Sequence, residues 1–492
     1  MAATTLPPLS AATLAALPAD VARPDYALDD VRIGIVHFGP GAFHRAHQAA
    51  YVDALLREHP AWGICAVALN STGVRDALRP QDGLYTLATL DTQRSLRVIG
   101  AIRELLGARD EPAAVLARLA EPAVKLVTLT ITEKGYCLAG EDLDTAHPDI
   151  AHDLAAPQTP RSAVGYLVAG LRERRARGIA PYTVLSCDNL AGNGLRLRRA
   201  VLQFAARVDP ALAAWIEAEV AFPCSMVDSI TPATDDALRD SVSAALGCRD
   251  AWPIQREAYT QWVVEDHFCN ARPPLEQVGV TLSHDIAGYD RAKLRLLNGA
   301  HSTLAYLGSL MELETVSVAM AEPLLAGFVE RLMREDIVPS LPPLAGFDPS
   351  TYVAAILARF RNPAIRHLLA QIAWDGSQKI PVRLLGTIAE ALAAGRSIAR
   401  LCVPVAGWLH FVARQARHGV AIVDPLADTL ARTGAACTGT ADDIAAWLAL
   451  DGVFGTLAGD ARFVTALTDA YVALAPATPQ AVRRVLAAPP CA

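Results

Sequence analysis

The sequence lacks an excess of positive charge, a long apolar run and a secretory start. Its 44 lysine and arginine residues stand against 51 aspartate and glutamate residues, which gives a formal net charge of −7. This balance argues against nucleic acid or an anionic membrane surface as a partner. No apolar run approaches the ~18 residues that a membrane-spanning helix requires. The first thirty residues also lack a basic start followed by an apolar stretch, so we do not expect a signal peptide.

The sequence also lacks any close pairing of cysteines. The nine cysteines are scattered along the chain and never form a Cys-x-x-Cys motif. An odd number at irregular spacing is the pattern of neither a disulfide framework nor a thiolate zinc site. We therefore expect reduced thiols and a cytoplasmic location.

What the sequence has in quantity is apolar residues. Its 492 residues are 52% hydrophobic and 19% charged, which suits a globular chain of two or three domains. In the first half, β-branched or apolar runs alternate with stretches of helical spacing. The runs cover residues 31–38, 62–69, 125–132 and 182–186. This alternation predicts an α/β fold, a Rossmann-like doubly wound parallel sheet, over residues 1–286.

From about Tyr289 the strand-like runs become scarce and segments rich in Ala, Leu, Glu and Arg take over. These segments cover residues 290–311, 319–336, 350–372, 382–394, 404–416 and 461–474, with prolines such as Pro404 as punctuation. The pattern predicts an all-α domain over residues 287–492. Ligand sites favour domain interfaces and the carboxyl ends of parallel strands, so we expect the site in the crevice between the two halves.

A glycine motif follows the first predicted strand. Gly39 and Gly41 lie between a strand and a helix, where a dinucleotide needs a tight turn and a close approach of its pyrophosphate to the backbone. The third glycine of the usual Gly-x-Gly-x-x-Gly motif is replaced by His44, so an ordinary strand-to-helix turn remains an alternative. After the second strand, Asn70 stands where an acidic residue would bind the ribose, with Arg75 a turn further on. We expect NAD as cofactor, with NADP as the alternative.

Longer motifs carry a more specific signal. They are His37-Phe-Gly-Pro-Gly-Ala-Phe-His-Arg-Ala-His-Gln48, Thr130-Ile-Thr-Glu-Lys-Gly-Tyr136, Ser186-Cys-Asp-Asn189, Met226-Val-Asp-Ser-Ile-Thr-Pro232, Lys293-Leu-Arg-Leu-Leu-Asn-Gly-Ala-His301 and Asp375-Gly-Ser-Gln-Lys-Ile-Pro381. Together they resemble the mannitol dehydrogenase family of polyol-specific long-chain dehydrogenases. The resemblance implies a Rossmann-like N-terminal domain, a helical C-terminal domain, a nicotinamide cofactor and no catalytic metal. On the cofactor side we assign Gly39, Gly41, Phe43 and Asn70.

The segment from Lys293 to His301 can carry the chemistry of an alcohol and ketone interconversion. On a regular α-helix, Asp290, Lys293, Asn298 and His301 fall within an arc of about 140°. A buried Lys293 could exchange the hydroxyl proton, while Asn298 and His301 could stabilise the developing alkoxide. By itself the pattern also fits a core-facing helix with a lysine that reaches solvent. The resemblance favours the catalytic interpretation and matches Lys293 to the family's catalytic lysine.

The resemblance also implies substrate-binding roles for Asn189 and Lys379. From the residues alone, Asn189 could be a turn asparagine and Lys379 a solvent-exposed lysine. The cluster of His44, Arg45 and His47 has no cysteine or carboxylate spaced for zinc. Packing or phosphate contact on the cofactor side is the expected role of that cluster.

The choice of substrate depends on residues 371–383. Mannitol dehydrogenases, as the resemblance suggests, have an arginine eight residues before the lysine at 379, whereas this chain has Gln371. The segment looks more like the fructuronate reductase branch, and Arg383 could pair with a substrate carboxylate. We therefore expect reduction of D-fructuronate to D-mannonate. The alternatives are a mannitol 2-dehydrogenase or another polyol dehydrogenase (mannitol with fructose, arabinitol with xylulose), and a non-catalytic dinucleotide-binding protein.

The expected partner is a small sugar acid or polyol, bound by a monomer or a small homo-oligomer. A non-catalytic chain would be expected to have lost at least one of Lys293, Asn298 and His301, and all three are present.

Overall fold

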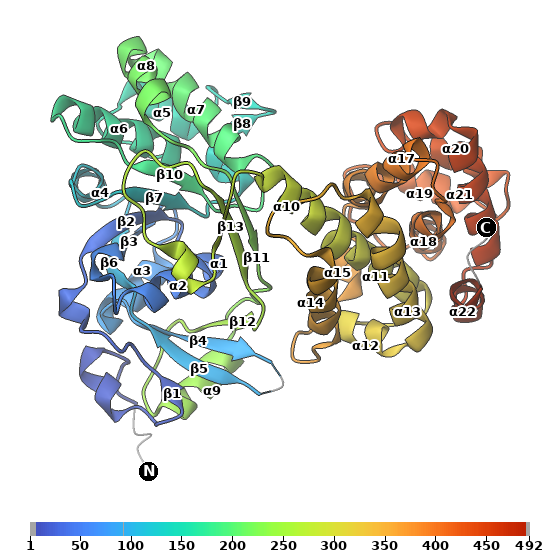
Figure 1. Ribbon diagram of the computed structural model, residues 1–492, viewed down its shortest axis with the longest axis horizontal. Coiled ribbons are helices and arrows are strands. Elements are labelled where there is room, and N and C mark those ends of the chain that lie inside the picture. The colour runs from blue at the N-terminus through green and yellow to red at the C-terminus, as the bar shows by residue number, and fades with distance from the viewer. Residues whose placement is uncertain (1–5, 92, 489–492) are drawn as a thin grey trace. The chain divides into compact units, whose positions relative to one another are not determined.

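The apolar runs of the first half form one parallel sheet. In the computed structural model, which describes residues 6–91 and 93–488, this half is a compact unit, Met1–Ala287. Five strands pair in parallel in the order β10-β7-β2-β3-β6 (Figure 1). Their bounds are Ile33–Phe38 (β2), Gly63–Ala68 (β3), Ile102–Gly107 (β6), Leu126–Leu129 (β7) and Thr183–Ser186 (β10). Numbered along the chain, the order is 5-4-1-2-3, so the predicted doubly wound Rossmann-like sheet is confirmed.

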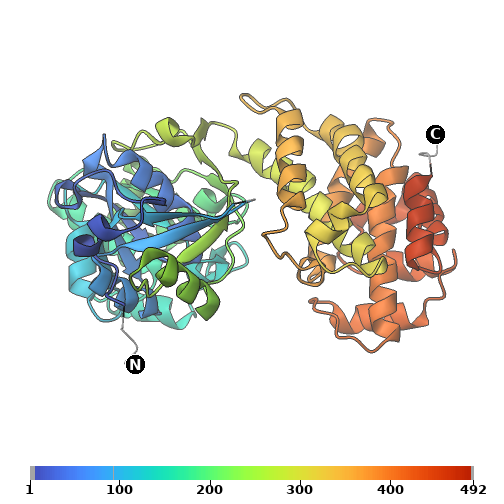
Figure 2. The ribbon, with the colours of Figure 1, turned by 90° about the horizontal axis from the view of Figure 1, so that it is seen from below.

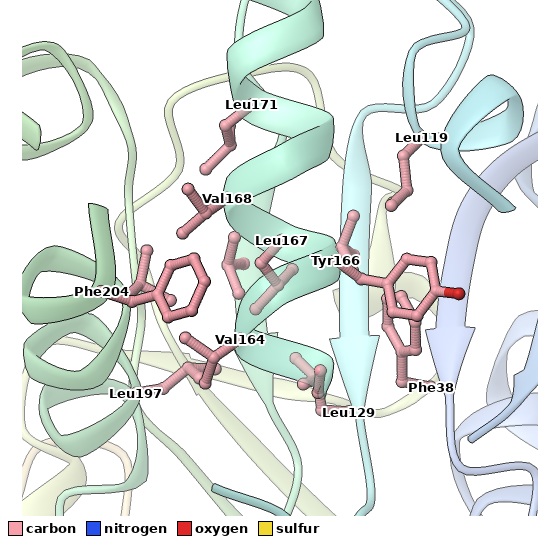
Figure 3. Packing of buried hydrophobic residues seen from close by; sticks show 14 of the residues in the cluster. Phe38, Leu119, Leu129, Val164, Tyr166, Leu167, Val168, Leu171, Leu197 and Phe204 are labelled. Atoms are coloured by element: carbon pink, nitrogen blue, oxygen red, sulfur yellow. The ribbon is translucent and has the colours of Figure 1, made fainter. Parts of the chain in front are cut away.

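Both faces of this sheet are covered, which explains why its strands are mainly apolar, with Arg103 and Glu104 of β6 as exceptions. Along β2, Val36 and Phe38 belong to a core with α4, α6 and α7, whereas Ile35 belongs to a second core with α2. Figure 3 shows the first of these cores, where the ring of Tyr166 from α6 lies 5.8 Å from that of Phe38. Its hydroxyl donates to the carbonyl of Ala108 at 2.5 Å, so the one polar atom of this buried ring is satisfied.

Helices of the first unit connect these strands. Their bounds are Ala42–Ala46 (α1), Gln48–Leu55 (α2), Gly73–Leu78 (α3), Pro112–Leu119 (α4), Pro148–Ala155 (α5), Ala163–Ala176 (α6), Asn193–Val208 (α7), Pro210–Glu219 (α8) and Asp236–Leu246 (α9). α1 and α2 directly follow β2, and α2 packs against β3. The chain therefore makes the β-α-β unit that the sequence predicts around Gly39 and Gly41.

Two smaller sheets and a hairpin lie outside the predicted pattern. One sheet has the order β1-β5-β4-β12, the other the order β11-β13-β14, and β8 pairs with β9. The bounds are Val21–Ala22 (β1), Tyr85–Leu90 (β4), Ser95–Ile99 (β5), Leu138–Ala139 (β8), Asp142–Leu143 (β9), Ser225–Asp228 (β11), Ile254–Glu257 (β12), Gln261–Glu265 (β13) and Thr281–Ser283 (β14). Most of these strands are short, and several bring together parts of the chain far apart in sequence, so local patterning does not reveal the pairing.

The second unit, Gly288–Ala492, is helical over its described part, as predicted (Figure 2). After α10 (Ile286–Ala292), which crosses the boundary between the units, its helices are Gly299–Leu310 (α11), Val316–Ala321 (α12), Pro323–Arg331 (α13), Pro349–Arg361 (α14), Leu369–Ile372 (α15), Gly376–Ile380 (α16), Gly386–Ala393 (α17), Ala399–Arg417 (α18), Ala427–Ala436 (α19), Asp443–Leu448 (α20), Ala461–Leu474 (α21) and Pro479–Ala487 (α22). Within residues 6–91 and 93–488, no helix is both long and apolar enough to cross a bilayer.

Several predicted helices of this unit have different limits. The predicted helix 350–372 ends at Arg361, because Pro363 disfavours a helical conformation at Asn362. Pro404 does not end a helix but lies inside α18, where it removes one backbone hydrogen bond. The helix tolerates this loss because buried residues on both sides of Pro404, such as Leu401 and Leu409, anchor it in the core.

In the described part of this unit, residues 288–488, three segments are π-helical rather than α-helical. They are Lys293–Asn298, Leu332–Ile337 and Pro381–Leu385. A π-turn pairs residues five apart, is rare, and is often found at functional sites. The regular α-helix expected around Lys293 is therefore wrong for six of its residues.

Candidate functional site

The turn after β2 has the form that a dinucleotide requires. Gly39 has a φ of +91°, and a β-carbon there would lie 2.2 Å from the carbonyl oxygen of Thr130, so only glycine fits. Gly41 precedes α1, and a β-carbon there would meet nothing closer than the Gly39 oxygen at 3.9 Å. The space beside Gly41 is therefore open to a ligand. Phe43 follows on α1, its ring stacked on that of His47 at 4.8 Å.

This turn lies at the topological switch point of the sheet, where β2 pairs with both β3 and β7. The side chain of His37 on β2 reaches the neighbouring strand β7 and the residues after it. Its Nδ1 lies 2.8 Å from Thr128 Oγ1, and its Nε2 lies 3.0 Å from Thr130 Oγ1. Burial lowers the pKa of His37 to about 3, so the ring is neutral. The ring of His44 stacks on it at 3.4 Å. The neutral rings of His37 and His44 therefore lie stacked beside Gly39.

Several buried polar atoms at and near these two rings lack hydrogen-bond partners within the described chain. Both ring nitrogens of His44 and both amide atoms of Gln48, one turn later, are buried without a hydrogen bond to any described residue. Such groups are normally satisfied, so they are candidates for contact with a ligand. Arg45 instead points into the protein, where it donates to the Trp252 carbonyl at 2.6 Å and lies over the Tyr85 ring. Arg45 is thus a packing residue.

Asn70 follows β3 and is exposed, as its predicted place beside a ribose requires. Its carboxamide oxygen accepts from Arg109 Nη2 at 2.9 Å, and Arg109 also pairs with Asp149 at 3.0 Å. Arg75 pairs with Asp76 at 2.8 Å and with other carboxylates. Both cations near this edge are neutralised by carboxylates, which leaves little positive charge for the extra phosphate of NADP.

Asn189 is exposed three residues after the end of β10, and its neighbour Asp188 fixes that part of the chain. The carboxylate of Asp188 accepts from Thr132 N at 2.8 Å and from the Tyr136 hydroxyl at 2.7 Å. Asn193 donates from its side chain to the Asp188 carbonyl at 2.9 Å. Asn189 therefore stands on a rigid corner at the carboxyl ends of the strands.

In the second unit, the π-turn places Lys293 and Asn298 on one side. Residues five apart are about one turn apart on a π-helix, whereas on an α-helix they diverge by about 140°. His301 follows Asn298 by three residues on α11, which is nearly a full α-helical turn. Lys293 and His301 are both buried. The three predicted catalytic side chains thus share a helix face more closely than a regular α-helix would allow.

Titratable groups surround these residues. Asp290, three residues before Lys293, has its pKa raised to about 6 by burial, opposed by the charge of Lys293. Burial, reinforced by the nearby His367, Arg359 and Arg383, lowers the pKa of His301 well below its ordinary value. His301 is therefore neutral at physiological pH, and its buried Nε2 has no hydrogen-bond partner among the described residues. A neutral imidazole can hydrogen-bond a substrate oxygen.

Arg383 lies beside the start of α11. Its Nη1 is 3.1 Å from Ser302 Oγ and 3.5 Å from the Asn298 carbonyl, and burial lowers the pKa of its guanidinium. No carboxylate of the described chain forms an ion pair with it. A half-buried guanidinium without an anion, adjacent to His301, suits an anionic ligand.

The other two predicted substrate residues lie nearby in the chain. Lys379 is half-buried on α16, its Nζ 3.4 Å from the Ile372 carbonyl and 4.0 Å from Asp375. Burial, together with the charge of Arg383, lowers the pKa of Lys379. Gln371 is exposed on α15, a helix that packs against α11.

The structure adds residues that sequence reasoning missed. The ring of His367 lies 5.0 Å from that of His301, edge on, and the Phe360 ring lies 4.5 Å from it on another side. Tyr306 has a buried hydroxyl without a partner in the described chain, and Arg383 is near enough to act on its pKa. Ser302 and Tyr306 could have been found, since they are four residues apart on the helix that carries His301 and so lie on one face of it. His367 carries no such signal, because it is 66 residues away and reaches His301 only through the fold.

Comparisons with known proteins cover most of the chain. The family model for the mannitol dehydrogenase Rossmann domain matches residues 33–277, and the model for the mannitol dehydrogenase C-terminal domain matches residues 285–475. D-mannonate oxidoreductase of Escherichia coli (strain K12) is 41% identical over 462 residues, which is 92% of this chain and 95% of the relative. A mannitol 2-dehydrogenase of Phaeosphaeria nodorum is 41% identical over 423 residues, 84% of this chain and 74% of the relative.

The structure agrees with these matches. The structure of Pseudomonas fluorescens mannitol 2-dehydrogenase in a ternary complex with NAD and D-mannitol superimposes with a TM-score of 0.80 at 39% identity, and covers 98% of this chain and 100% of its own. Sequence and fold therefore agree along the chain, and the resemblance seen in the motifs is confirmed. This chain belongs to the mannitol dehydrogenase family of oxidoreductases.

Proposed function

We propose that this protein is an NAD(H)-dependent oxidoreductase that reduces D-fructuronate to D-mannonate, with Lys293 as general acid and base. The observation that carries the choice of an acidic substrate is Arg383. It is a half-buried guanidinium without a carboxylate partner among the described residues, and it contacts Ser302 beside His301. A 41% identical D-mannonate oxidoreductase supports the same choice.

The first unit has the features that a bound NAD requires. Gly39 permits the turn, the space beside Gly41 is open, and the buried atoms of His44 and Gln48 can accept or donate hydrogen bonds. Arg75 and Arg109, each paired with carboxylates, favour NAD over NADP. When bound, the nicotinamide ring supplies the hydride that the carbonyl carbon of the ketone requires.

In the second unit, the side chains on one helix face exchange a proton with the substrate oxygen and hydrogen-bond it. The ammonium of Lys293 gives a proton to the oxygen as the carbonyl double bond is reduced, and the amine that remains takes it back in the reverse reaction. Asn298 and the neutral His301 hydrogen-bond the same oxygen while it carries negative charge. Asn189 and Lys379 bind other hydroxyl groups, and Gln371 can do so near the end of the substrate.

The second candidate is a mannitol 2-dehydrogenase, which the equally similar Phaeosphaeria nodorum relative favours. In that case Gln371 and Lys379 would bind a terminal hydroxyl group, and Arg383 would only support Ser302 and Asn298. The two candidates differ in whether the end group of the substrate is charged.

The experiment that separates them measures kcat/KM for fructuronate, tagaturonate, fructose, mannitol and arabinitol, each with NAD or NADP in the appropriate redox state. We expect fructuronate with NADH to give the highest value. A clear preference for fructose or mannitol would assign the chain to the polyol dehydrogenases. No turnover with any of the five would favour a non-catalytic dinucleotide-binding protein.

Replacing Gly41 by valine tests the cofactor site. The new side chain would occupy the space beside the turn. Beyond the two neighbouring residues in the chain, the atom nearest to the position of its β-carbon is the Gly39 carbonyl oxygen at 3.9 Å, so the fold itself should be little disturbed. We expect the Kd for NADH to rise at least about tenfold, roughly 1.4 kcal/mol. Fluorescence titration measures this directly, with Gly459→Val, at a glycine with open space around it in the second unit, as the control. An unchanged Kd would remove this turn from the cofactor site.

A further inference from the structure

The π-turn that carries Lys293 and Asn298 is held by a second side chain within it. Arg295 is buried, and its guanidinium binds both carboxylate oxygens of Glu390 on α17, at 2.5 and 2.7 Å. Its Nη1 also lies 3.3 Å from both the carbonyl and the hydroxyl of Ser340. Neither the family motifs nor the proposed chemistry gives Arg295 a role.

Arg295 also belongs to the π-helical segment that contacts the other two described π-helical segments of this unit. The segment Lys293–Asn298 packs against both Pro381–Leu385 and Leu332–Ile337. Ser340 donates to the carbonyl of Ile337, the last residue of the latter, at 2.7 Å. Glu390 belongs to α17, the helix that directly continues Pro381–Leu385. Through Glu390 and Ser340, Arg295 therefore connects the segment that carries Lys293 to residues next to the other two π-helical segments.

The π-turn needs such support because π-helical hydrogen bonding is rare and is found mostly as single turns inside α-helices. A π-turn differs from an α-helix by one inserted residue, so its loss would rotate Lys293 by about 100° relative to His301. Lys293 and Asn298 would then leave their common side. The hydrogen bonds from Arg295, together with its charge, hold the pKa of Glu390 below its ordinary value, so the pair stays ionised at neutral pH.

We propose that Arg295 is a positioning residue, which stabilises the π-turn through its bidentate ion pair with Glu390. The π-turn in turn keeps Lys293 and Asn298 on the side where they can contact the substrate oxygen. The role rests on the proposed function of Lys293. Arg295 itself contacts no substrate; it acts through the geometry of its own turn.

The test compares Arg295→Met with a matched control, Arg400→Met. Arg400 is an equally buried arginine of the same unit, with side-chain exposure of 9% like that of Arg295, and it pairs with Glu335 and Asp336 at 2.7 and 2.6 Å. Those partners lie on Leu332–Ile337, a π-turn that contains no proposed catalytic residue but packs against Lys293–Asn298. The control therefore asks whether loss of any ion pair in this π-helical region has the same effect. Both substitutions should lower the melting temperature similarly, because each removes a buried ion pair.

We expect Arg295→Met to lower kcat by about tenfold to a hundredfold, as misplacement of a reacting group does, with the Kd for NADH unchanged. The deuterium isotope effect with 4-deuterated NADH should be at least as large as in the wild type, because the chemical step becomes slower. Arg400→Met should keep a kcat close to the wild type. Glu390→Gln, a milder change at a half-exposed site, should lower kcat in the same direction, and the double variant should be no worse than Arg295→Met.

Hydrogen exchange provides a readout that does not need turnover. The amides of residues 293–298 should exchange faster in Arg295→Met than in Arg400→Met. Equal exchange, or equal loss of kcat in the two variants, would overturn the proposal. A wild type that exchanges slowly at these amides but reduces none of the five substrates would contradict the proposed function and leave the exchange comparison to decide the role of Arg295.

Discussion

Replacing Lys293 by alanine is expected to lower turnover at least about a hundredfold, because general acid–base groups contribute roughly 10² to 10⁴ in rate. The side chain is buried on the face that Asn298 and His301 share, so its removal deletes the proposed proton donor from that face. Cofactor affinity should be retained, since the proposed dinucleotide site belongs to the first unit. A small primary amine added to the variant should restore part of the rate.

Steady-state kinetics with fructuronate and NADH, together with a fluorescence titration of NADH, provides the measurement. Lys125→Ala is a suitable control, because Lys125 lies just before β7, at the amino-terminal ends of the parallel strands. The cofactor turn lies at their carboxyl ends. If Lys293→Ala binds NADH and keeps more than about a tenth of the wild-type turnover, Lys293 is not the acid–base residue. The lysine would then be one that only packs its stem in the core.

The parallel sheet was predictable because its information is local. Four of its five strands, β2, β3, β7 and β10, are mainly apolar because the sheet is covered on both faces, and helical stretches with their own periodicity separate them. The fifth strand, β6, was not predicted, because Arg103 and Glu104 interrupt its apolar run. The sheet β1-β5-β4-β12 was not predictable in the same way. It joins residue 21 to residue 257 through strands as short as two residues, and such pairing depends on long-range contacts.

The helical unit shows the same limit at finer scale. Residues 293–298 are mostly good helix formers, so sequence alone predicts a regular α-helix through them. The π-turn depends instead on tertiary contacts such as that of Arg295 with Glu390, 95 residues away. The break at Asn362, in contrast, could have been read from Pro363.

For the candidate site, the glycine turn and the Lys293 segment could be found because their residues are close in sequence. Which groups surround His301 could not, since His367 and Arg383 reach it from other parts of the helical unit. The roles of Lys293, Asn298, His301 and Asn189 stay predictions until variants are measured.

Replacing Arg383 by leucine is expected to cost about 2 to 4 kcal/mol in kcat/KM for fructuronate, because a carboxylate would lose its charged partner in a half-buried site. Fructose has no carboxylate, so any activity on it should change less than about tenfold. The size of this difference between the two substrates is the quantity that identifies a carboxylate-binding residue.

Arg383 could also act only through stability, because its contacts with Ser302 and the Asn298 carbonyl stabilise the start of α11. In that case the variant should lose activity on both substrates. Arg414→Leu is the matched control: Arg414 is likewise half-buried, and it donates to the Ser309 carbonyl near the other end of α11. Loss of stability alone should affect both variants and both substrates alike. A selective loss of fructuronate reduction in Arg383→Leu, with Arg414→Leu unaffected, requires a negative charge on the substrate near Arg383. Equal losses on fructuronate and fructose would instead make Arg383 a support for Asn298 and His301, and would return the choice of substrate to the polyols.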